Sequence, residues 1–563
     1  MKAVIIRIGI WVLALICLNI IASRYFVQWD LTSDQRFTLT QQSEDLLSEV
    51  EDVIFIQVYL EGEDFPAGFR RLRREVAQLL RQFHKLNPNI EYRFSDPLSG
   101  TPEQQASIIK EMIADGMPPV RLMVSDGASS SEQRIFPYAM ITYGSRQAHV
   151  NLLESQTPGQ PQDVILNNSA ALLEYKLSNS IQHLLTYSKP NVLFLQGHGE
   201  LTKQQSSALE QELRRFYNTA HASLDSLVAI SPEIDVLLVA DPRTAYSDRD
   251  KFLIDQYLMN GGNIMWLVDV LDVNLDSIAK YPGYIPGQKD LGLDYLWSKQ
   301  GFRPNADLIL DLESTRIPLQ VGQVGGQPDM QLFPWFYHPL VHGLPDHPIS
   351  SQLDRINLKF AGTVDTLRTD GKVKKTALMQ TSPYTRVQRY PMRLSFDMAH
   401  KQPDASKFDQ GVQTTAWLME GEFVSAYENR VPAPLRETMK QLGNEFRSRS
   451  SDSKVLIVTD GDISRSLYNS RTREFTALGY NKWENFVFGG NRDFIINAID
   501  YMVDERGIME SRKKEMKLRL LDPVRSTNKK LKWQLINILL PLSLFLLLSW
   551  GFHIYRRRKY TVR

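Results

Sequence analysis

Polar side chains able to take part in chemistry follow the hydrophobic strands predicted in the middle of the chain. Histidine and carboxylate groups bind zinc or harder cations, and ligands of doubly wound sheets bind beyond the carboxyl ends of the strands. The sequence therefore predicts a ligand-binding crevice at that edge. The residues are His198, Glu200, Asp241, Asp269, Asp460 and Asp462. The alternative stays open that these residues only cap helices or close turns after the strands.

Motifs for catalysis are missing from the sequence. It has no Gly-x-Ser-x-Gly elbow and no Gly-x-x-x-x-Gly-Lys-Ser/Thr loop, so it cannot be expected to hydrolyse ATP itself. An amidotransferase-like site needs a cysteine nucleophile, and the single cysteine, Cys17, lies in an apolar N-terminal run. We therefore expect a non-enzymatic protein with no catalytic residue, no metal and no cofactor. A hydrolase that uses the same carboxylates is the least favoured hypothesis.

Both ends of the chain are apolar over the length that a helix needs to cross a bilayer. Residues 3–23 carry one charge, Arg7, and residues 535–555 carry none. We predict an uncleaved N-terminal anchor, with a cleaved signal peptide as the alternative, and a C-terminal transmembrane helix. In that second helix, Asn537, Pro541 and Ser543 are the predicted contacts with a partner helix.

Charge and cysteine content give the expected sidedness. Basic residues at 556–559 follow the second span and favour the cytoplasm, although several others precede it at 517–532. The long segment between the spans has no cysteine, which favours an oxidising compartment. We therefore expect both termini in the cytoplasm and the bulk of the chain outside. The basic residues before the second span could contact anionic lipid head groups or form a solvated linker.

The composition is that of a globular protein. The chain has 563 residues, of which 43% are apolar and 23% charged, and its length corresponds to about three or four domains. With 65 basic and 64 acidic residues, the net charge of +1 argues against binding to nucleic acid.

The periodicity of the segment after the first anchor predicts an α/β domain. The strand VIFIQVYL precedes a helix with apolar residues at helical spacing, and the strand IEYRFSDP follows. This order predicts parallel pairing of the two strands with a crossover helix. Further short strands and a helix over 164–185 complete a thioredoxin-like domain, without a Cys-x-x-Cys motif and so without redox chemistry.

A second α/β domain is predicted from Lys189 onward. Apolar strands alternate with helices, which indicates a parallel sheet covered on both faces, in a doubly wound, flavodoxin-like or amidotransferase-like fold. We expect an irregular loop over 322–348, with an aromatic run at 334–339 that serves either as a contact surface or as core. We expect an exposed polar insertion over 386–449.

These predictions divide the chain into six parts. They are an N-terminal anchor over 1–24, a thioredoxin-like domain over 25–188, a doubly wound domain over 189–510, a basic stalk over 511–533, a transmembrane helix over 534–555 and a basic cytoplasmic tail over 556–563.

Short blocks along the whole chain resemble a family of auxiliary subunits of ABC transporters, the gliding-motility-associated (GldG-type) components. The similar blocks are WDLTSDQRFTLT, VYLEGEDFPAGFRRLRREV, IEYRFSDP, LQGHGE, YLMNGGNIMWLVD, NRDFIINAIDYM and the terminal WQLINILLPL and YRRRKY. Each block is short, and their order and spacing carry the resemblance.

The resemblance implies a subunit of the bacterial inner membrane with its bulk in the periplasm, assembled with an ABC permease and a cytoplasmic ATPase. It also implies a link to gliding and to the associated secretion, and it supplies no catalytic residues. Two hypotheses follow: an auxiliary subunit that couples these partners to the large domain, and a component that captures a sugar, peptide or metal in the strand-end crevice.

Overall fold

The computed structural model describes Trp11 and Asn19, and then residues 38–62, 65–126, 129–154, 161–281, 283–401, 403–432, 436–437, 440, 445–470, 473–514 and 523–561. It forms two compact units, Met1–Met516 and Lys517–Arg563. The predicted N-terminal anchor, apart from Trp11 and Asn19, lies outside the described residues.

The first unit begins with a four-stranded sheet in the order β2-β1-β5-β6. Strands β1 (Ile54–Val58) and β2 (Ile90–Phe94) pair in parallel across helix α3 (Ala67–Leu86), which confirms the predicted strand–helix–strand unit. Strands β5 (Tyr138–Tyr143) and β6 (Arg146–Asn151) are antiparallel to their neighbours. Alternate residues of β1 are fully buried against the helices, as a strand with one covered face requires.

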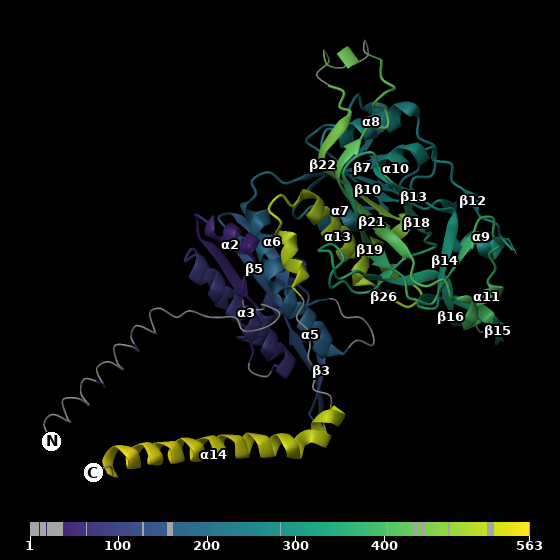
Figure 1. Ribbon diagram of the computed structural model, residues 1–563. Helices are drawn as coiled ribbons and strands as arrows, with labels where there is room; N and C mark the ends of the chain where they lie inside the picture. Colours follow the sequence, from purple (N-terminus) through teal and green to yellow (C-terminus); the bar gives the residue numbers. More distant parts are fainter. Residues whose placement is uncertain are drawn as a thin grey trace. The chain divides into compact units, whose positions relative to one another are not determined.

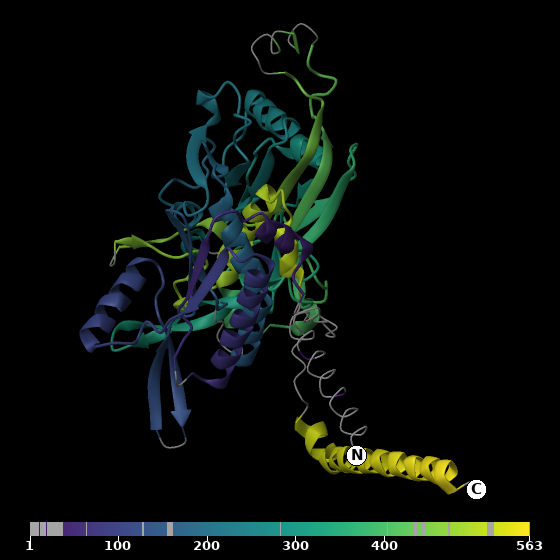
Figure 2. The same cartoon turned by 90° about the vertical axis from the view of Figure 1, so that its left-hand side faces the viewer.

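Helices α2 (Gln41–Ser48), α3, α5 (Gln162–Ala171) and α6 (Leu173–Leu185) supply the rest of this core. The prediction of one helix over 164–185 is wrong in its continuity, because the helix breaks at Leu172. The Ser169 hydroxyl donates to the Ile165 carbonyl and accepts from the Glu154 amide, a competition that bends helices. Helix α4 (Pro102–Ala114) and the hairpin β3 (Val120–Asp126)–β4 (Ser129–Ile135) follow β2, and the hairpin projects from the body (Figure 2).

A ten-stranded sheet forms the centre of the second α/β part. Its five parallel strands lie in the order β8-β7-β9-β10-β22, which is second, first, third, fourth and fifth along the chain. Figure 1 labels β7, β10 and β22 of this sheet. They are β7 (Asn191–Gln196), β8 (Asn218–Ser223), β9 (Val236–Ala240), β10 (Asn263–Leu267) and β22 (Arg449–Val458).

Helices cover both faces of these parallel strands. Alternate residues such as Phe194 and Leu238 pack with α7 (Ser207–Leu213) and α13 (Gly489–Val503). The residues between them, such as Leu193 and Leu237, pack with α8 (Asp248–Met259) and α10 (Asp294–Gln300). The predicted α/β class is confirmed. The finer names, thioredoxin-like and flavodoxin-like or amidotransferase-like, stay predictions.

The loop predicted over 322–348 is wrong. Strands β15 (Ser314–Val324) and β16 (Gln327–Gly343) form a long antiparallel hairpin there. Gly325 and Gly326 have φ values of 61° and 79°, which is the geometry of a two-residue hairpin turn that suits glycine. The aromatic run is core: Trp335 and Tyr337 are both 1% exposed, beside residues of β14 (Asp307–Asp311).

The prediction of an exposed insertion over 386–449 fails for its middle. Residues TTAWLMEGEFV form β21 (Thr414–Val424), an interior strand between β19 (Val373–Gln380) and β22. Its apolar side chains are buried except for Trp417, which is half-buried. The two Glu and the Gly within the run make its composition look like that of an exposed segment.

The remaining elements are short. They are β11 (Leu271–Asp272), α9 (Leu275–Lys280), β12 (Gly287–Gln288), β13 (Phe302–Pro304), β17 (Ile356–Asn357), β18 (Val364–Thr366), β20 (Thr385–Arg389), α11 (Asp397–His400), β23 (Tyr468–Asn469), β24 (Glu474–Phe475), β25 (Tyr480–Asn481), β26 (Phe486–Val487), and the 3-10 turns η1 (Leu224–Ser226), η2 (Ala405–Lys407), η3 (Gly461–Ser464) and η4 (Ile508–Lys513).

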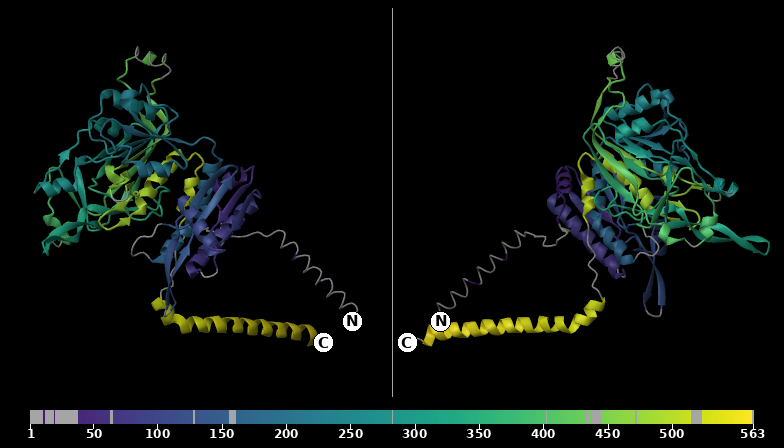
Figure 3. Two further views of the ribbon diagram at one scale, coloured as in Figure 1. Left: turned by 180° about the vertical axis from the view of Figure 1, so that it is seen from behind. Right: turned by 45° about the vertical axis from the view of Figure 1, so that its right-hand side comes forward.

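The described residues of the second unit form one long helix, α14 (Pro523–Thr561), drawn in yellow in Figure 3. Within it, Lys532–Tyr560 is the one candidate membrane span among the described residues, and its most apolar stretch of 18 residues has a mean hydropathy of 2.1. Pro541 lies inside the helix, and the Ser543 hydroxyl donates to the Leu540 carbonyl. Because α14 begins at Pro523, the later part of the predicted stalk is helical.

Candidate functional site

The six predicted site residues lie at one edge of the central sheet, in two neighbouring clusters. His198 and Glu200 follow β7, Asp241 follows β9, and Asp269 follows β10, while Asp460 and Asp462 follow β22. Because the strand order reverses between β7 and β9, this is the switch point where parallel sheets bind ligands.

The first cluster surrounds a buried histidine. The His198 amide donates to the Glu200 carboxylate at 2.6 Å, and the ring nitrogen Nε2 lies 3.3 Å from Asp250 Oδ2. The ring stacks on Tyr246 at 3.8 Å between centroids, and the Tyr246 hydroxyl donates to Glu200 at 2.7 Å. Burial, and then the Glu200 charge, raise the pKa of Tyr246 well above its usual value. Glu200 is therefore satisfied by groups of the chain itself.

The glycines of Gly197-His198-Gly199 explain why this turn is Gly-rich. Both have positive φ, 116° and 80°. A Cβ on Gly199 would lie 2.9 Å from the Arg243 Cβ, and one on Gly197 would lie 2.6 Å from the Ser223 hydroxyl. The absence of a side chain at both glycines thus allows the backbone of this turn to pack directly against Ser223 at the end of β8 and Arg243 after β9.

The second cluster centres on Asp241, whose side chain is 1% exposed. Its carboxylate accepts from Lys289 at 2.7 Å, from Arg243 at 2.7 Å and from Arg465 at 2.6 Å. Asp241 also has a φ of +53°, a left-handed conformation that Asp and Asn adopt more readily than other side chains. One carboxylate thus holds three cations from three different loops.

The other carboxylates complete this cluster. Asp269 accepts from the Gly461 amide at 3.1 Å and lies 4.0 Å from Lys289, while Asp460 accepts from the amides of Lys359 and Asp462 at 2.6 and 2.7 Å. Burial raises the pKa of Asp269 to about 7 against the attraction of Lys289. Burial, and then the charge of Asp269, raise the pKa of Asp460 well above its usual value.

Sequence reasoning missed the cations Lys289, Arg243 and Arg465 and the partners Tyr246 and Asp250. Only Arg243, in the Asp-Pro-Arg run after β9, carried a local signal. Among the described residues, no three or more His, Cys, Asp or Glu side chains are grouped so that they could hold a metal ion.

Asp269 gives the cluster an expected pH dependence. Between the unfolded pKa of about 4 and the folded value of about 7, the folded chain holds a proton that the unfolded chain has lost. The free energy of unfolding should therefore fall as the pH rises through this window, by up to about 1.4 kcal/mol per unit. Asp269→Asn cannot ionise and should flatten the slope, measured as denaturant midpoints of the full chain at pH 5 and pH 8. An unchanged slope in the variant would contradict the assignment.

A further buried carboxylate joins the two α/β parts. Asp500 on α13 accepts from the Tyr175 hydroxyl at 3.0 Å, from Asn179 Nδ2 at 3.2 Å and from the Tyr217 hydroxyl. Tyr175 and Asn179 belong to α6 of the first part. A cavity of about 250 Å³ lies beside this junction. No signal in the sequence pointed to Asp500.

Residues 189–498, more than half of the chain, match the family described as "ABC-type uncharacterized transport system". The chain belongs to this family. Residues 33–142 match a second family, described as a domain of unknown function. The family match supports a transport-associated auxiliary role and, with α14, association with a membrane.

No curated protein matches the chain. Among solved structures, it is similar to one titled "mmIFT52 N-terminal domain", at 10% sequence identity and a TM-score of 0.31. The match covers 56% of this chain and 97% of that one.

Proposed function

We propose that this chain is a non-enzymatic auxiliary membrane subunit of an ABC transporter, which couples a permease and an ATPase to its large α/β unit. The observation that carries the proposal is the family match over 189–498 in a chain that also has the apolar helix Lys532–Tyr560. No side chain of that span is buried by other parts of the described chain, so a bilayer or partner helices can cover it.

The coupling requires contacts that differ between two states of the partners. Asn537 and Ser543 are exposed on α14, and polar side chains stabilise helix pairs in lipid. We assign the permease contact to the α14 surface that carries Asn537, Pro541 and Ser543. The same proposal places the α/β unit in the periplasm, both termini in the cytoplasm, and the chain in the bacterial inner membrane, in contact with lipid. It includes the link to gliding motility that the resemblance implies.

The test is recovery of partners with a tagged full chain in mild detergent. An ABC permease and its ATPase should co-purify, and Asn537→Leu with Ser543→Leu should lower their recovery about tenfold. The matched control, Leu539→Ile with Leu546→Ile, keeps the apolar surface and should leave recovery unchanged. A chain that purifies alone under these conditions contradicts the proposal.

The second candidate is capture of a small ligand in the strand-end crevice. The position of both clusters at the switch point supports it, as does Arg243, whose side chain is 46% exposed while it pairs with Asp241. Thermal shifts of the full chain with divalent cations, sugars or dipeptides should then disappear when His198 and Asp460 are both substituted. Failure of every probe to shift the wild type would argue against capture.

A further inference from the structure

A single buried carboxylate receives both of the segments that lead out of the α/β unit. Glu174 lies in the first turn of α6 and is 6% exposed. Its Oε1 accepts from the amide and the hydroxyl of Thr40 at 2.7 and 2.8 Å, and its Oε2 accepts from the Lys514 ammonium at 2.5 Å. The positive end of the α6 dipole also favours this charge.

The N-terminal segment is held by hydrogen bonds at Thr38 and Thr40. The Thr40 hydroxyl caps α2 by accepting from the Ser43 amide, so the same side chain starts a helix and binds Glu174. The Lys514 ammonium also donates to the Thr38 carbonyl. Thr38 opens the first continuous stretch of described residues after the predicted N-terminal anchor.

The C-terminal segment reaches Glu174 as a strap across both α/β parts. Ile508 and Met509 of η4 are buried in the core of the first part. Arg512 is 4% exposed and donates to the carbonyls of Pro348 and Ser351 in the second part, at 2.9 and 3.1 Å. Lys514 ends the strap, and the sequence then continues toward α14.

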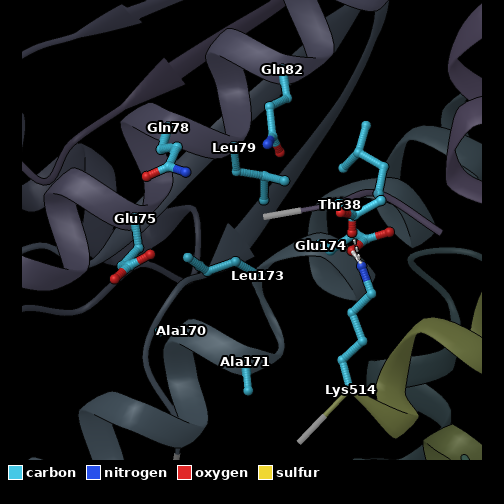
Figure 4. Close-up of a pocket in the computed structure, with 11 residues that line it drawn as sticks. Thr38, Glu75, Gln78, Leu79, Gln82, Ala170, Ala171, Leu173, Glu174 and Lys514 are labelled. Carbon is cyan, nitrogen blue, oxygen red and sulfur yellow. Dashed lines mark hydrogen bonds and ion pairs between the residues drawn. The ribbon is translucent and has the colours of Figure 1, made fainter. Parts of the chain in front are cut away.

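The surroundings of this contact allow it to open. A cavity of about 30 Å³ adjoins it, lined on the α3 side by Glu75, Gln78 and Gln82 (Figure 4). Figure 4 shows Lys514 reaching from the strap toward Glu174 and Thr38. The apolar side chains of Leu39, Leu79 and Leu173 line the cavity as well. The polar groups and the small free volume next to the ion pair give water a place from which to solvate the separated charges.

We propose that Thr40, Glu174 and Lys514 form a latch that holds together the two segments leading to the membrane and releases them together. Tension on either segment is transmitted to the same carboxylate, so loosening one end loosens the other. The inference rests on the proposed function, because it requires that both segments continue to membrane helices. In the coupling cycle, opening of this latch is the step that allows the N-terminal and C-terminal segments to move apart.

The test compares hydrogen exchange in the full chain with that of Glu174→Gln and Lys514→Met. Exchange in α2 (Gln41–Ser48) and in η4 should rise together, at least tenfold, in both variants. The decisive result is that Lys514→Met speeds α2, which is distant in sequence. The control is Glu49→Gln, which removes an exposed ion pair with Arg506 that joins the same two segments and should change little. Independent responses of the two segments overturn the latch.

Zero-length carbodiimide cross-linking tests release. It should join Glu174 to Lys514 in the isolated chain, and Lys514→Arg should give no such product. In a complex with permease and ATPase, ATP should lower the yield at least fivefold, and an equal yield with and without ATP overturns the release step. If no partner co-purifies, the proposed function fails, while exchange in the isolated chain still decides the latch.

Discussion

Asp241→Ala is expected to destabilise the second α/β part by about 3–5 kcal/mol, because it leaves three cations clustered without their shared anion. Lys289 is only 5% exposed, so its charge cannot be relieved by water. Alanine also fits the left-handed conformation at this position poorly. The measurement is the free energy of unfolding of the full chain in denaturant, followed by tryptophan fluorescence, since Trp266 on β10 is fully buried.

Two variants separate charge from geometry. Asp241→Asn keeps an acceptor and tolerates the same backbone conformation, so it should cost less, about 2 kcal/mol. Asp365→Asn removes an ion pair with Arg303 whose side chains are 52% and 58% exposed, and it should cost under about 1 kcal/mol. Equal stabilities of Asp241→Ala and Asp365→Asn would show that the cluster does not stabilise the fold.

Asp500→Ala is expected to cost about 3 kcal/mol and to uncouple the two α/β parts. The substitution strands the hydroxyls of Tyr175 and Tyr217 in a buried site, where each unpaired polar group is costly. In the wild type, burial and then the charge of Asp500 raise the pKa of both phenols well above the usual value, so both hydroxyls stay protonated and can donate to this carboxylate. Thermal unfolding of the variant should split into two transitions.

The matched control for this junction is Asp493→Asn on the same helix. Asp493 pairs with Arg492, whose side chain is 45% exposed. Among the described residues, Asp493 has no hydrogen bond with Tyr175 or Tyr217. Its unfolding should stay in a single transition close to that of the wild type. A single transition in Asp500→Ala as well would mean that other contacts couple the two parts.

The sequence predicted four of the five parallel strands, β7, β9, β10 and β22, because each contains an uninterrupted apolar run. It missed β8, the edge strand NTAHAS, whose side chains are small or polar and only partly buried. Phe194 and Leu193 are both buried, on opposite faces, and only a strand covered on both sides needs that pattern. The hairpin β15–β16 escaped prediction because its glycines and prolines are typical of loops. Two-residue hairpin turns also favour glycine, so glycine alone does not distinguish a hairpin from an irregular loop. The pairing between the two strands distinguishes them, and it is visible only in the structure.

The acidic half of the strand-end site was predictable, and the basic half was not. Residues that follow a buried strand lie at a known edge of the sheet, which placed Asp241 and Asp460 correctly. Lys289 and Arg465 arrive from loops whose course depends on tertiary packing. Contacts such as Glu174 with Lys514 join residues 340 positions apart, a separation at which local periodicity carries no information.

The two ends of the α/β unit, at Thr38 and Lys514, lie close together because both contact or adjoin Glu174. Domains whose ends lie close together tolerate transplantation and circular permutation, since neither operation needs to stretch the interior. Joining Thr38 to Lys514 through a short flexible peptide, with new ends in the exposed turn at Gly325-Gly326, should therefore preserve the fold. The arrangement also lets evolution exchange the flanking hydrophobic segments without redesigning the body between them.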